Sequence, residues 1–156
     1  MDIKKDSIVS APSEEIIIEL QEYSNVQYPL SFIRFLKQYN GAVPIDNKFI
    51  VDDYEYIIER FLCIMDNPDE DPVGNYDISI VLTQLDERLT DNGDLVGDEL
   101  IPIAALFAGN FVCLDYRKRQ GNPSICVWDH EESDVFNPVT YYVSESFDKF
   151  VEMLAK

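Results

Sequence analysis

The sequence predicts a single-domain α+β fold with a largely antiparallel sheet of about six strands. Apolar residues recur at helical spacing near both ends of the chain and once near its middle. Short segments rich in β-branched and aromatic residues stand between these stretches, without the regular βαβ alternation of a parallel sheet. A chain of 156 residues, 46% of them hydrophobic, can bury one core, so we expect one domain over residues 1–156.

Two helices are predicted first. Ser13 is placed to cap a helix with Glu14 and Glu15 in its first turn, followed by the apolar stripe Ile16, Ile17, Leu20 and Tyr23. Tyr28-Pro29 opens a second helix, and Asn40-Gly41 supplies a left-handed terminator. We expect the two helices to form a hairpin.

Strands and one middle helix follow. Residues 48–53 and 56–65 are predicted strands, and the proline- and acid-rich residues 66–75 are an exposed loop. A helix is expected over 76–89, and a second acidic loop over 90–99. The remaining segments are four strand-like stretches, 100–107, 110–117, 124–131 and 139–143, and a last helix capped by Ser144.

The composition predicts a cytoplasmic protein. No window approaches 18 uncharged apolar residues, and the two lysines near the N-terminus are not followed by the apolar region of a secretory signal. Cys63, Cys113 and Cys126 are odd in number and each lies in an apolar run, so we expect buried, reduced thiols.

Charge is the strongest compositional signal. Thirty Asp and Glu against 12 Lys and Arg give a formal net charge of −18. Such a field repels phosphate backbones, so we expect no direct nucleic-acid binding, and a basic protein partner fits better. The alternative is that the acids only keep the protein soluble.

The sequence offers little for catalysis. His130 is the only histidine and stands among Trp128, Asp129, Glu131 and Glu132, where negative potential favours its charged form and makes it a poor general base. We expect it instead to bond a carboxylate or the backbone at a strand end. No phosphate-binding glycine motif, zinc ligand spacing or EF-hand pattern occurs, so no catalytic residue, cofactor or metal site is predicted.

The acids concentrate in one region. Between Asp66 and Glu99 there are eleven acids and one base, Arg88, a net charge of −10 in 34 residues. This stretch and the acids after Trp128 form the predicted partner-binding surface, with twelve candidate residues: Asp66, Asp69, Glu70, Asp71, Asp91, Asp94, Asp98, Glu99, Trp128, Asp129, Glu131 and Glu132. Arg117, Lys118 and Arg119 form a positive island at a hairpin tip, interpreted as a solubilising turn that prevents edge pairing.

Several of these features together resemble the SUKH superfamily over about residues 13–155. They are Tyr28-Pro29 opening a helix that closes at Asn40-Gly41, LIPIAALF leading to NFVCLDY, the strand ICVWDHE, and the closing SFDKFVEML. The chain departs from the family at Tyr28, where many members have Leu, and at Leu106-Phe107-Ala108, where members often carry a more polar turn. These differences bear on partner choice more than on fold.

The resemblance implies a non-enzymatic binder. Bacterial members of this size are cytoplasmic immunity proteins that neutralise a cognate secreted toxin, often a nuclease and in Gram-positive bacteria sometimes of the LXG type. A regulatory scaffold like the fungal members is the alternative, and an enzyme that uses carboxylates is a third hypothesis. We expect a toxin with a basic nuclease-like domain as partner, no membrane contact, and a monomer, with a dimer as the alternative.

Overall fold

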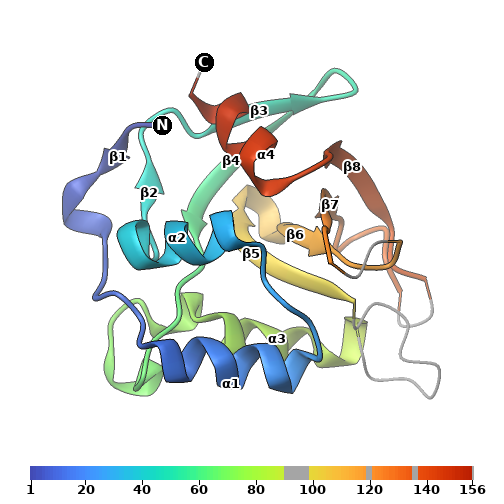
Figure 1. Cartoon of the computed structure of the whole chain (residues 1–156). Helices are drawn as coiled ribbons and strands as arrows, with labels where there is room; N and C mark the ends of the chain where they lie inside the picture. The colour runs from blue at the N-terminus through green and yellow to red at the C-terminus, as the bar shows by residue number, and fades with distance from the viewer. Residues whose placement is uncertain (90–98, 119–120, 135–136, 156) are drawn as a thin grey trace.

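The computed structural model describes residues 1–89, 99–118, 121–134 and 137–155. It confirms the predicted α+β fold, with α-helices and a six-stranded antiparallel sheet in the described part of the chain. Figure 1 shows α2 and α4, which contact each other, on one side of the sheet, and α1 and α3 below it. The helices are α1 (Glu14–Ser24), α2 (Leu30–Tyr39), α3 (Ile78–Leu89) and α4 (Phe147–Leu154).

The large sheet is a meander in which neighbours in sequence are neighbours in space. Its order is β3-β4-β5-β6-β7-β8, and every pairing is antiparallel. The strands are β3 (Lys48–Val51), β4 (Tyr54–Phe61), β5 (Leu100–Leu106), β6 (Phe111–Asp115), β7 (Ser124–Trp128) and β8 (Thr140–Ser144). A separate two-stranded sheet joins β1 (Ile3–Lys4) to β2 (Val43–Pro44).

Short 3₁₀ turns connect these elements. They are η1 (Lys5–Ser7), η2 (Pro68–Glu70), η3 (Gly74–Tyr76) and η4 (Phe107–Gly109). Because the meander is antiparallel, the β3–β4 turn, η4 and the chain after β7 all lie at the same end of the sheet. We call this the η4 end of the sheet. Residues 62–77 leave β4 at the opposite end.

Aromatic rings join the helices to the sheet. Phe35 of α2 lies 4.7 Å from Phe61 of β4 and 5.3 Å from Phe147 of α4, measured between ring centroids. Phe150 of α4 meets Phe49 of β3 at 5.4 Å. Burying an aromatic side chain contributes about 2 to 3 kcal/mol, so this cluster fixes α2 and α4 on the sheet.

The helix boundaries correct two local predictions and confirm a third. Ser146, not Ser144, caps α4 by accepting a hydrogen bond from the Lys149 N–H at 3.3 Å. The middle helix starts at Ile78, two residues later than expected, because Asp77 takes the capping role. At the end of α2, Gly41 supplies the predicted left-handed residue with φ of 68°, and Asn40 before it has φ of −52°. Among the described helices, none is both long and apolar enough to cross a membrane.

Candidate partner-binding surface

The first acidic group is a folded loop. Asp66, Asp69, Glu70 and Asp71 are all exposed, and we call residues 66–71 the acidic loop. The carbonyl of Asp71 accepts a hydrogen bond from Gly74 N at 3.0 Å, and its side chain accepts one from Val73 N at 2.9 Å. A Cβ on Gly74 would lie 1.6 Å from the Pro68 carbonyl oxygen, so only glycine fits this close backbone approach. The loop therefore presents its carboxylates from a defined backbone.

The second acidic group follows β7. The Asp129 carboxylate accepts hydrogen bonds from the backbone N–H groups of Glu131 and Glu132, both at 2.9 Å. Glu131 and Glu132 are exposed, whereas Asp129 is half-buried. Glu132 also accepts a hydrogen bond from the Tyr141 hydroxyl, which raises the pKa of Tyr141 to about 12. The turn after the strand is therefore ordered by its own acids.

The structure does not bring the two acidic groups together. The acidic loop follows the end of β4, whereas Asp129 and Glu132 lie close enough to Tyr56, near the start of β4, to help burial raise its pKa. Seven residue steps along β4 separate these ends by roughly 20 Å. The predicted surface is thus two acidic regions at opposite ends of the sheet.

Trp128 does not belong to either region. Its side chain is 0% exposed and packs 6.3 Å from the Phe111 ring across the β6–β7 pair. β7 is covered on both faces, so the predicted position of Trp128 on the partner-facing surface is wrong. Of the other candidates, Glu99 is half-buried just before β5, and Asp91, Asp94 and Asp98 lie outside the described residues.

His130 is held by the side-chain amide of Asn110. Asn110 Oδ1 lies 2.7 Å from the His130 ring Nδ1 and accepts the His130 backbone N–H at 3.1 Å. Gly109 packs against the ring, since a Cβ there would lie 3.1 Å from it. The histidine therefore connects the chain after β7 to the turn between β5 and β6.

The described residues show one buried carboxylate, and both of its oxygens are used. Asp77 is 2% exposed, and Oδ2 accepts the Met65 N–H at 2.8 Å while Oδ1 accepts the Ser79 N–H at 2.8 Å. These bonds cap α3 and tie it to the chain after β4. Asp77 thus has a structural role.

The three thiols are buried, as the sequence predicted. Burial, followed by the nearby Asp77 carboxylate, raises the pKa of Cys63 to about 12. Burial also raises the pKa values of Cys113 and Cys126, which face each other across β6 and β7. Thiols with raised pKa values are poor nucleophiles. Within the described part of the chain, no three His, Cys, Asp or Glu side chains gather in a metal-binding arrangement.

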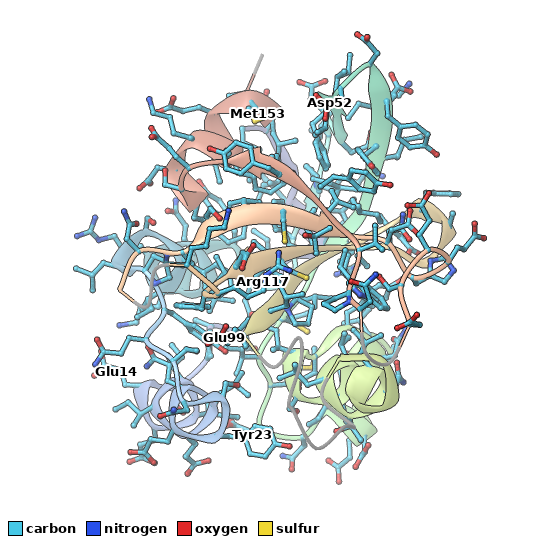
Figure 2. All side chains as sticks on the ribbon, turned by 90° about the vertical axis from the view of Figure 1, so that its right-hand side faces the viewer. Glu14, Tyr23, Asp52, Glu99, Arg117 and Met153 are labelled. Carbon is cyan, nitrogen blue, oxygen red and sulfur yellow. The ribbon has the colours of Figure 1, made fainter. Side chains whose placement is uncertain are left out.

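Sequence reasoning missed the groove between α1 and α3. Its volume is about 550 Å³, and Glu19, Tyr23, Met65 and Asp66 are among the residues that line it. Figure 2 shows Tyr23 between the two helices. The residues that α1 contributes to this groove can be located from its own sequence. The position of α3 beside them depends on tertiary packing, so the groove itself could not be predicted.

Comparison with known proteins agrees with this fold. A family model described as SMI1-KNR4 cell-wall, of the SUKH group, matches residues 14–151. The chain belongs to the SUKH family. The SPbeta prophage-derived uncharacterized protein YokK of Bacillus subtilis strain 168 is 27% identical over 148 residues, covering 91% of this chain and 74% of that protein. The SUKH family is known for immunity proteins that interact with toxins and is generally non-enzymatic.

Proposed function

We propose that this SUKH protein is a cytoplasmic immunity protein that binds and neutralises a cognate secreted toxin with a basic, nuclease-like domain. The observation that carries the proposal is the formal net charge of −18 on a member of this family, with exposed carboxylates on an ordered acidic loop. A nuclease needs a positive cleft to hold phosphates. An acidic surface complements that cleft and can cover it.

The acids act in this proposal mainly on the rate of association. Opposite fields steer two proteins together over roughly one Debye length, about 8 to 10 Å at 0.1 to 0.15 M salt. Exposed carboxylates lose little hydration before contact, so they contribute less to the lifetime of the complex than buried anchors do. Salt should therefore slow binding strongly.

The first test combines rescue with binding. Expression of the chain should rescue cells that produce the toxin encoded by the adjacent gene. His130→Ala should retain rescue, because the histidine has no catalytic role in a protein that acts by binding. Loss of its contacts with the turn between β5 and β6 should lower affinity several-fold at most, which is tolerated when the immunity protein is abundant. Failure of the wild-type chain to rescue or to bind would contradict the proposed function.

Charge removal tests the role of the acidic loop. Replacing Asp69, Glu70 and Asp71 by Asn, Gln and Asn should slow association with the toxin domain about tenfold and flatten its salt dependence. A matched control removes three exposed charges elsewhere, by Glu145→Gln, Asp148→Asn and Glu152→Gln. Surface plasmon resonance at several salt concentrations measures both. Equal effects of the two triple variants would mean that only net charge matters.

The description of the matched family model as a cell-wall protein favours a second candidate, a regulatory scaffold that binds other proteins without neutralising a toxin. Rescue by the wild-type chain would decide against it.

A further inference from the structure

The turn between β5 and β6 holds its backbone in a conformation that its sequence disfavours. Ala108 has φ of 69° and ψ of 14°, in the left-handed region that costs a residue with a Cβ free energy. Leu106 N donates to Asn110 O at 2.9 Å and closes the turn, and the contacts of Asn110 and Gly109 with His130 support it from the side. The surrounding structure thus fixes this turn in one shape.

The fixed turn presents an aromatic side chain to solvent. Phe107 is 69% exposed, among the most exposed large hydrophobic side chains of the described residues. An exposed phenylalanine on a rigid turn gives the fold no burial energy. Aromatic side chains of this kind are typical anchors of protein interfaces, because a preformed conformation reduces the entropy lost on binding.

A groove of about 430 Å³ begins beside Phe107. It runs from the η4 turn to η3 and α3, and Glu59, Tyr76, Gln84 and Phe107 are among the residues that line it. Because η3 directly follows the acidic loop and Gly109 packs on His130, the groove lies between the two acidic regions. The groove therefore connects the two acidic regions, which lie at opposite ends of β4.

Glu59 supplies the carboxylate of the groove lining. Glu59 is exposed, and its Oε1 accepts a hydrogen bond from the Tyr76 hydroxyl at 2.8 Å, while no described residue donates to Oε2. The Arg60 guanidinium lies over the Tyr76 ring, 5.5 Å from its centroid, and donates to the carbonyls of Ser7 and Gly41 at 3.0 and 2.6 Å. Glu59 can therefore accept hydrogen bonds from a lysine or arginine of a partner.

We infer that Phe107 and Glu59 form the anchor site for the basic toxin domain, with Phe107 entering an apolar pocket of the toxin and Glu59 pairing with a lysine or arginine beside it. This inference rests on the proposed function and names the surface that carries it. The acidic loop and the acids after β7 flank the anchor site and steer the partner toward it. The backbone of the turn already has the conformation that exposes Phe107, so it does not need to rearrange before the partner binds.

The test measures the affinity of the purified chain for the toxin domain encoded by the adjacent gene. Phe107→Ala should raise Kd about tenfold or more, mainly through faster dissociation, because the truncated side chain is an anchor. Phe107→Lys should abolish binding by placing a cation against a basic partner. Glu59→Gln should raise Kd about threefold to tenfold. Since both side chains are exposed, the midpoint of urea unfolding should stay unchanged.

Tyr23→Ala is the matched control, since Tyr23 is a 75% exposed aromatic on α1. It should change Kd less than about twofold, as most exposed contacts outside an anchor do. If the wild-type chain binds and Phe107→Ala and Phe107→Lys bind equally well, the anchor site is wrong while the proposed function stands. A loss with Tyr23→Ala alone would assign binding to the groove between α1 and α3. No binding by the wild-type chain would overturn both proposals.

Discussion

Asn40 shows how one side chain can connect three segments. Its amide nitrogen donates to the carbonyls of Ser10 at 2.8 Å and Ile64 at 2.9 Å, and its Oδ1 accepts the Ile64 N–H at 3.0 Å. The residue is 1% exposed, so these bonds lie away from water. Asn40 thus joins the end of α2 to the N-terminal segment and to the chain after β4.

Asn40→Ala should lower the free energy of unfolding by about 3 kcal/mol, because the buried N–H and C=O of Ile64 lose their partner. Urea denaturation measures this loss. Asn67→Ala is the control, since Asn67 is exposed and its change should stay within about 0.5 kcal/mol. A loss below about 1 kcal/mol for Asn40→Ala would show that water replaces the amide.

At the scale of elements, the sequence predicted the parts whose signals are local. Amphipathic spacing located all four helices within a few residues, since each helix is stabilised by a stripe that its own sequence contains. The role of Asn40 could not be predicted in this way, because its partners lie 24 and 30 positions away. The same limit applies to Arg117, which was interpreted as part of a solubilising hairpin tip.

Arg117 folds back over the sheet. Its Nε and Nη2 donate to the two carboxylate oxygens of Asp115 at 2.9 and 2.7 Å, and Nη2 also donates to Thr140 Oγ1 at 2.8 Å. Figure 2 shows Arg117 near the middle of the sheet. Arg117 thereby links β6 to the edge strand β8. Arg119 lies outside the described residues.

This link predicts a pH-dependent stability. Burial of Asp115 opposes its ionisation, but the Arg117 hydrogen bonds outweigh burial and lower its pKa. A lowered pKa adds stability above the unfolded value of about 3.9, and that stability is lost as pH falls through the folded pKa. Arg117→Ala should therefore cost about 1 kcal/mol at pH 7 and progressively less as pH falls below about 4, through the lowered pKa of Asp115.

Unfolding in urea at pH 7 and at low pH measures the two values for Arg117→Ala. Lys118→Ala is the control for loss of one positive charge, because Lys118 is exposed and makes no described salt bridge. An equal cost of Arg117→Ala at both pH values would mean that its packing, and not the ion pair, stabilises β8.

At the scale of the whole molecule, the sequence predicted an acidic surface but not its arrangement. The number of acids between Asp66 and Glu99 can be counted without knowing the fold. The separation of roughly 20 Å between the two acidic regions depends on how β4 runs between them. Trp128 was misplaced because β7 is covered on both faces, and a short strand of that kind shows no alternation of polar and apolar residues. Exposure of Phe107 was likewise hidden in an apolar run that continues from β5.

The closed core predicts how the three thiols react. Cys63 and Cys113 are 0% exposed and Cys126 is 2% exposed, and each lies in or beside the central strands. A reagent can reach strands in the middle of a sheet only when the domain opens as a whole, because removing one strand exposes its neighbours. In the folded state, the raised pKa values also leave little of the reactive thiolate, so reaction without opening is slow. Labelling of the native protein should therefore be slow for all three cysteines, at one common rate that rises with urea as the unfolded population does. Mass spectrometry after timed exposure to a thiol reagent measures the three rates. Fast labelling of a single cysteine, with the other two protected, would instead indicate a local opening and a functional thiol.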